Sequence, residues 1–189
     1  MKKTVLTFGL ISGAIISAMM LATVPFIHRI GFNRGMVIGY TTMVLAFLLV
    51  FFGIRSYREN YGDGRISFAR ALGVGLLIML ITCACYVITW EIIYFNILPD
   101  FADTYAAHLI DNSRKNGASE AELARQMEEM KKFKEMYNNI FFNVAMTFLE
   151  PLPVGLVMTL ISALILRKHK KEKQHLQEFP DHVNHVNPV

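Results

Sequence analysis

Two acidic residues, Glu91 and Glu150, lie inside long apolar stretches of the sequence. A charged side chain in a membrane segment costs about 2.5–3.5 kcal/mol or more on insertion scales, so it usually faces a polar partner or water. Glu150 is followed by Pro151 and Pro153, which lack the N–H that would hydrogen-bond one turn back and which bend a helix. A bent helix with free carbonyls beside an acid is a place where protons or cations bind. Glu150 is therefore either an ion or proton site or a structural acceptor for Thr or Tyr side chains of another span.

Glu91 has a different setting, because it lies near the end of its apolar stretch between Trp90 and Tyr94. Tryptophan and tyrosine are enriched where a membrane segment meets water. Two interpretations stay open for Glu91: solvation at the membrane surface, or a polar site inside the protein.

No familiar catalytic or cofactor motif accompanies these acids in the sequence. The patterns HExxH, GxSxG and the Walker loop are absent, and the basic residues do not form the aromatic-interleaved surface that binds nucleic acids. Cys83 and Cys85 are two positions apart, so on a helix they point in opposite directions and cannot share a metal or a disulfide. His182 and His185 near the end of the chain have no carboxylate or thiol beside them. We predict a protein without catalytic activity, cofactor, metal or nucleic-acid partner.

The elements that carry these residues are four apolar stretches, each of about 20 residues or more, which is the length a helix needs to cross a hydrocarbon core of about 30 Å. They cover residues 5–27, 35–54, 71–95 and 140–166. Lipid offers no hydrogen bonds to a bare backbone, so each stretch must be helical. The sequence predicts an all-α, polytopic membrane protein with four transmembrane helices, whose first partner is the lipid bilayer.

Basic residues predict the orientation of these helices, because short cytoplasmic loops are rich in Lys and Arg. Lys2 and Lys3 precede the first stretch, four arginines lie in residues 55–70 after the second, and residues 167–173 are strongly basic. The long connection of residues 96–139 instead holds six Lys or Arg and eight Asp or Glu. We expect a multi-pass protein of the bacterial inner membrane with both termini in the cytoplasm.

Residues 100–139 between the third and fourth spans are predicted to form an extracytoplasmic αα-hairpin. Asp100 can cap the first arm, and Asn116-Gly117 is typical of a helix end. Ser119 and Glu122 have the spacing of a capping box at the start of the second arm. The second arm carries apolar residues at helical spacing, and we expect it to run straight into the fourth span.

Small residues at fourfold spacing predict close helix packing in the first two spans. Gly9, Gly13 and Ser17 form one such series, and Gly35 and Gly39 form another. In lipid, such surfaces allow helices to approach closely. They serve either packing within the molecule or the interface of a homo-oligomer.

Three groups of residues together resemble a bacterial family of four-span membrane proteins described as a domain of unknown function, family 4199. They are residues 52–60 with 66–68, residues 98–101, and residues 150–155 with 160–167. The resemblance covers about residues 3–171. It implies a four-helix membrane fold and a membrane location, and it carries over no catalytic or binding residue.

The chain is therefore expected to form one transmembrane domain, residues 1–172, followed by a disordered cytoplasmic tail, residues 173–189. Two functions remain open. One is a non-enzymatic membrane scaffold or accessory subunit that meets an unidentified membrane or periplasmic protein through the hairpin. The other is an oligomeric, ion- or proton-coupled permease for small solutes that uses Glu150.

Overall fold

A computed structural model describes residues 1–168 of the chain. The predicted tail, residues 173–189 with His182 and His185, lies outside the described residues. Within residues 1–168 the fold is helical, and four segments are long and apolar enough to cross a membrane: Lys2–Phe26, Phe32–Tyr61, Phe68–Ile97 and Ile140–Leu166. The predicted fold class and the four membrane helices are confirmed.

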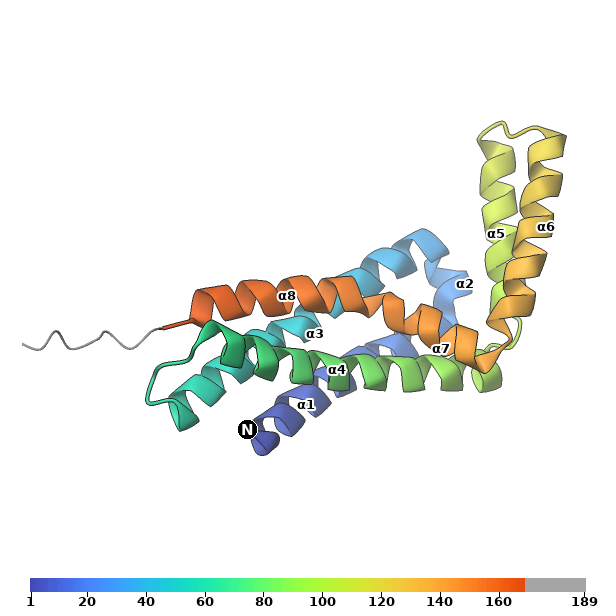
Figure 1. Cartoon of the computed structure of the whole chain (residues 1–189). Coiled ribbons are helices and arrows are strands. Elements are labelled where there is room, and N and C mark those ends of the chain that lie inside the picture. Colours follow the sequence, from blue (N-terminus) through green and yellow to red (C-terminus); the bar gives the residue numbers. More distant parts are fainter. Residues whose placement is uncertain (169–189) are drawn as a thin grey trace, which may run out of the picture.

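The helices run in the order α1 (Lys2–Thr23), η1 (Val24–Phe26), α2 (Ile27–Ile30), α3 (Phe32–Tyr61), α4 (Phe68–Ile92), η2 (Ile93–Ile97), α5 (Phe101–Lys115), α6 (Glu120–Tyr137), α7 (Ile140–Leu149) and α8 (Pro151–Leu166). Figure 1 shows that the N-terminus, the α3–α4 connection and the end of α8 lie at one end of the bundle. We call it the terminal end. The opposite end carries α5 and α6 and is called the hairpin end.

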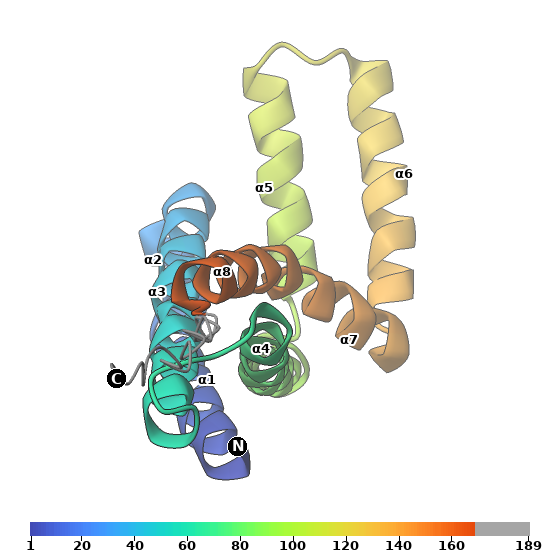
Figure 2. The ribbon, with the colours of Figure 1, turned by 60° about the vertical axis from the view of Figure 1, so that its left-hand side comes forward.

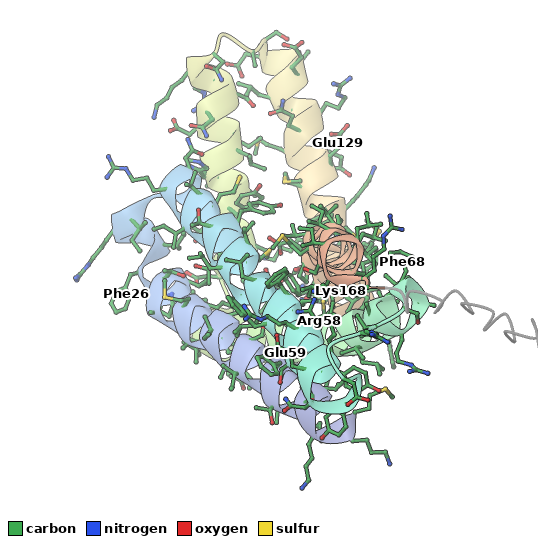
Figure 3. All side chains as sticks on the ribbon, turned by 90° about the vertical axis from the view of Figure 1, so that its left-hand side faces the viewer. Phe26, Arg58, Glu59, Phe68, Glu129 and Lys168 are labelled. Atoms are coloured by element: carbon green, nitrogen blue, oxygen red, sulfur yellow. The ribbon has the colours of Figure 1, made fainter. Side chains whose placement is uncertain are left out.

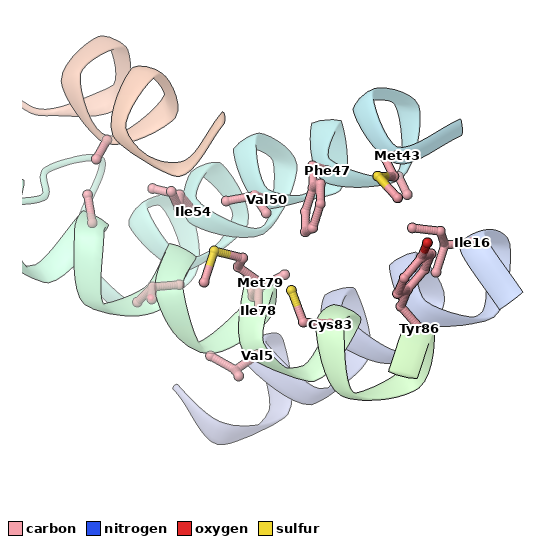
Figure 4. Packing of buried hydrophobic residues seen from close by; sticks show 14 of the residues in the cluster. Val5, Ile16, Met43, Phe47, Val50, Ile54, Ile78, Met79, Cys83 and Tyr86 are labelled. Atoms are coloured by element: carbon pink, nitrogen blue, oxygen red, sulfur yellow. The ribbon is translucent and has the colours of Figure 1, made fainter. Parts of the chain in front are cut away.

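From the middle of the bundle to the terminal end, the helices are densely packed (Figure 4). Phe47, Val50, Ile54 and Ile78 are all 0% exposed. Gly155 of α8 lies so close to α4 that an added Cβ would stand 2.6 Å from Cγ of Met79. Such close approach matters in lipid, where van der Waals packing holds helices together.

The first small-residue series, Gly9, Gly13 and Ser17, lies against α4. A Cβ at Gly9 would come within 2.8 Å of Ile81, and the Ser17 hydroxyl accepts a hydrogen bond of 2.7 Å from the Thr89 hydroxyl. This face of α1 is thus occupied within the molecule.

The terminal end is closed by polar contacts between sequence-distant segments. The Arg58 guanidinium donates to the Leu166 carbonyl at the end of α8 (3.3 Å), and the Lys168 amide donates to the Ile66 carbonyl (3.0 Å). Figure 3, seen from this end, shows Arg58 and Lys168 close together beside α8. The first bond satisfies a carbonyl that the last turn of α8 leaves free, and the second joins the end of α8 to the α3–α4 connection.

The hairpin has the predicted arms and turn. Gly117 adopts a positive φ of 86° between α5 and α6, and Ser119 and Glu122 form the predicted capping box. Asp100 occupies the cap position of α5 without a side-chain capping bond. Figures 1 and 2 show that both arms run across the bundle axis and that the tip extends beyond α2 and α3.

The predicted continuous helix from the second arm into the fourth span is wrong. Helix α6 ends at Tyr137, and Asn139 caps the new helix α7 by accepting from the Phe141 amide (3.0 Å). Asparagine is a strong N-cap residue because its side chain competes with the backbone as a hydrogen-bond partner. The break lets the hairpin turn across the bundle end.

Candidate functional site

A cavity of about 360 Å³ lies beneath the hairpin, and we call it the hairpin cavity. This volume falls within the range of about 300–1,000 Å³ that is common for small-molecule sites. Helices α1, α3, α4, α5 and α6 line it together with Glu150. The walls are mainly apolar and include five methionines: Met19, Met20, Met36, Met43 and Met130. Methionine is flexible and polarizable, so such walls adapt to the shape of a bound molecule.

Helix α3 diverges from α7 toward the hairpin end, as Figures 1 and 2 both show, and residues of α3 line one side of the cavity. Gly39 faces this space: an added Cβ there would meet no atom within 4 Å. The predicted packing role is therefore wrong for Gly39 within the described chain. Gly35 does pack closely, against the Ile27 side chain, and also contributes to the lining.

Aromatic contacts hold the hairpin over the cavity. The Phe32 ring at the start of α3 stacks on His108 with centroids 4.8 Å apart, and it also contacts Phe101 and Tyr105 of α5. On α4, the Trp90 ring packs edge-on against Phe101 at 5.0 Å. Such aromatic pairs contribute about 0.5–1.5 kcal/mol each beyond their burial.

A chain of hydrogen bonds joins the cavity-lining residues of α4 and α6 to α7, which lies behind them. The Trp90 indole donates to the Tyr137 hydroxyl (3.0 Å), which is bonded to the Thr147 hydroxyl (3.2 Å). Thr147 in turn donates to the amide oxygen of the fully buried Asn143 (3.0 Å). Burial raises the pKa of the Tyr137 phenol above its usual value, so the hydroxyl stays neutral and able to donate.

Glu150 lies at the break between α7 and α8 and lines the cavity. The prolines produce this break as predicted: α7 ends at Leu149 and α8 begins with the buried Pro151, while Pro153 is exposed on the bundle surface. The Tyr86 hydroxyl donates a hydrogen bond of 2.6 Å to Oε2 of Glu150. The sequence offered Thr or Tyr side chains of another span as donors to Glu150, and in the structure Tyr86 of α4 is the donor.

Glu91 lies outside the cavity lining, so the two acids do not share a site. Both carboxylate oxygens of Glu91 are enclosed, and among the described residues they have no hydrogen-bond partner.

An ion pair closes the side of the cavity next to the hairpin. The Lys134 ammonium of α6 binds both carboxylate oxygens of Asp103 in α5, each at 2.6 Å. Sequence reasoning missed this pair, as well as Trp90 and Tyr137, because it did not connect the two arms with α4. The spacing of Tyr86, Trp90 and Tyr94 on one helix face was the available signal.

Four apolar helices, a crosswise hairpin and a partly open apolar cavity define a multi-pass helical membrane protein with a candidate binding site at one end of its bundle. The chain matches the model of a protein family of unknown function, DUF4199, over residues 7–168, and it belongs to that family. The predicted resemblance is confirmed. No curated protein and no solved structure matches the chain significantly.

Proposed function

We propose that this protein is a non-enzymatic accessory protein of the bacterial inner membrane, which binds a lipid-soluble molecule in the hairpin cavity. The observation that carries the proposal is an adaptable apolar cavity that ends at Glu150. Its walls suit an apolar ligand, and the cavity is partly open to its surroundings.

The dense packing between the middle of the bundle and the terminal end favours a binding function over a permease function. A solute path needs polar groups or water along its length. Beyond Glu150, the space between α3, α4 and α8 is filled by Phe47, Met79 and Ile54, each 0–2% exposed. The hydrogen-bonded groups of the cavity wall are therefore separated from the terminal end by a tightly packed, mainly apolar core, in which the buried Thr82 hydroxyl donates to the Ile78 carbonyl of its own helix.

We propose that the terminal end faces the cytoplasm. It gathers Lys2, Lys3 and the four arginines of residues 55–70, whereas the hairpin segment carries a net charge of −2 from six basic and eight acidic residues. In this orientation the hairpin cavity opens to the periplasmic leaflet. Reporter fusions after Tyr61 and after Gly117 should report opposite sides of the membrane.

Binding can be measured through Trp90, because it is the one tryptophan of the chain and lines the cavity. Purified protein in lipid nanodiscs is titrated with dodecanol brominated along its chain, which quenches tryptophan on contact. We expect a saturable component of quenching. Quenching that rises only linearly, as for partitioning into lipid, would overturn the proposal.

Two glycine variants make this test specific. Gly39→Phe places a ring in the open cavity, whereas Gly73→Phe places one on an exposed face of α4 where an added Cβ also meets no atom within 4 Å. We expect Gly39→Phe to remove the saturable component and Gly73→Phe to keep it. Equal quenching curves for the two variants would contradict a site in the cavity.

We propose that the hairpin is the surface through which this accessory protein contacts a partner protein. A groove of about 550 Å³ lies between its arms, with Ala106, Ala107 and Met127 in its wall. A photocrosslinker at Ala107, compared with one at the outward Glu129 (Figure 3), tests this in native membranes. A partner protein crosslinked at position 107 and not at 129 supports the proposal, and equal products at both positions contradict it.

A further inference from the structure

We infer that the ligand of the hairpin cavity is a mainly apolar molecule bearing one cationic or hydrogen-bond-donating group, which binds to the Glu150 carboxylate. This inference rests on the proposed binding function and names its ligand class. It follows from the position of the acid, the atoms already in use, and the state of the other charged groups around the cavity.

The geometry leaves one side of the carboxylate available. Tyr86 is buried at 7% exposure and donates to Oε2, which fixes the direction of the Glu150 side chain. Among the described residues, Oε1 accepts no side-chain hydrogen bond, and Glu150 is exposed to the cavity it lines. A carboxylate accepts through both oxygens, so Oε1 is the atom that a ligand would reach.

The surroundings favour a donor over an acceptor at this point. A carboxylate in an apolar wall is costly unless it is paired, and a cation or an N–H or O–H group supplies that pairing. Trp90 lies one helical turn from Tyr86 and also lines the cavity. An aromatic ring face attracts a cation within about 6 Å, so the indole adds to the preference for a positively charged group.

Lys134, the basic residue of the cavity lining, does not create a preference for an anionic ligand group. Lys134 is bound by both oxygens of Asp103 at 2.6 Å, so it already has a carboxylate partner within the protein. The remaining unpaired charge of the lining is that of Glu150. Charge complementarity therefore selects a cation or donor, and an anionic head group at Lys134 is the alternative that the test must exclude.

The test compares three probes with the same chain brominated along its length: dodecylamine, dodecanol and dodecanoate. Each is titrated into the full-length protein in nanodiscs at neutral pH, and the saturable quenching of Trp90 gives the affinity. We expect the amine to bind tightest, the alcohol next and the carboxylate weakest. One charged hydrogen bond predicts a difference of about tenfold or more between amine and carboxylate.

Glu150→Gln should remove the preference for the amine, because the amide keeps the shape of the side chain and loses its charge. Glu150→Asp keeps the charge but withdraws it by one methylene, and it should reduce the preference severalfold. Glu129→Gln on the outer face of the hairpin is the matched control and should behave as the unaltered protein. The ranking of the three probes in the unaltered protein decides the inference even where a variant fails to fold.

The outcomes separate this inference from the proposed function. Equal saturable binding of all three probes, lost in Gly39→Phe, would overturn the inference and leave the proposed function standing. Tightest binding of the carboxylate would also overturn it, in favour of an anionic group at Lys134. Absence of saturable quenching with every probe would overturn both.

Discussion

The two halves of the bundle use small residues in opposite ways. Toward the terminal end, Gly155 brings α8 onto α4, and the space around it is filled by Met79 and Phe47. Toward the hairpin end, Gly39 faces open space, because α3 diverges from α7. Glycine therefore allows close helix contact in one half of the bundle and borders open space in the other. The difference lies in whether a neighbouring helix approaches the glycine.

Polar groups follow the same division. At the terminal end, the Arg58 guanidinium satisfies a helix carbonyl and ties α3 to α8. At the hairpin end, hydroxyl and indole groups bond to one another around the cavity, and a carboxylate is left facing it. The packed half holds the bundle together, and the hollow half offers binding chemistry.

The largest expected contrast comes from adding a leucine side chain to each half. Gly155→Leu would force atoms against Met79 and Phe47 at distances under 3 Å, so we expect failure to form a monodisperse protein. Gly39→Leu meets open space and should fold normally. Size-exclusion chromatography in detergent checks both, and normal behaviour of Gly155→Leu would contradict the close packing.

Removing a ring should also affect the halves unequally. Phe47→Ala leaves a hole in a fully buried site and should cost about 3 kcal/mol of unfolding free energy. This lies at the lower end of values for soluble cores, because in lipid the unfolded side chain is not exposed to water. The half-buried Phe133, which lines the cavity, should lose less than half as much on change to alanine. Equilibrium unfolding in mixed micelles measures both, and equal losses would show that the halves are packed alike.

At the terminal end, Arg58→Leu removes the hydrogen bond to the Leu166 carbonyl and should cost about 1–2 kcal/mol. Arg55→Leu is the matched control, since among residues 1–168 the half-exposed Arg55 pairs only with Glu59 one turn away. This variant should change stability by less than about 0.5 kcal/mol. Hydrogen exchange of the Arg167 and Lys168 amides should rise in the first variant alone. Faster exchange of these amides in both variants would show that the hydrogen bond from Arg58 to the Leu166 carbonyl does not stabilise the end of α8.

The smallest expected effect lies at the hairpin tip. Ser119→Ala removes the N-cap of α6 and should lower local helix stability by about 1 kcal/mol, seen as faster amide exchange at Glu122 and Leu123. Hydrogen bonds from Ser119 lower the pKa of Glu122 below its ordinary value of 4.5. The folded pKa is the lower one, so this capping contribution is present above pH 4.5 and is lost as falling pH protonates Glu122. If the exchange rates of the Glu122 and Leu123 amides, corrected for intrinsic rates, do not change with pH, the Glu122 carboxylate does not stabilise the N-cap of α6.

Local signals in the sequence predicted much of the fold. Long apolar stretches define spans because the bilayer imposes a length and a helical backbone. The helix stop at Asn116-Gly117, the Ser119 capping box and the bend at Pro151 depend on neighbouring residues only, and each was predicted in place. Family membership followed from the same local patterns.

The break at Asn138–Asn139 marks where local signals competed. Apolar residues at helical spacing continue on both sides of these asparagines, which favoured one long helix. The structure instead uses the Asn139 side chain as a cap, and a hydrogen bond of 3.0 Å from Tyr94 to Asn138 fixes the corner against η2. That second bond joins residues 44 positions apart, so the sequence spacing gave no sign of it.

The sequence by itself determined that this chain crosses a membrane four times, that a helical hairpin separates the last two spans, and that an acid interrupts the fourth. These features follow from the length of apolar stretches and from contacts between near neighbours. Only the tertiary structure decided that the hairpin turns across the bundle, that Tyr86 meets Glu150, and that Gly39 faces a cavity. The physical reason is that a cavity is a property of several helix directions at once, and each direction is set by packing between segments far apart in the chain.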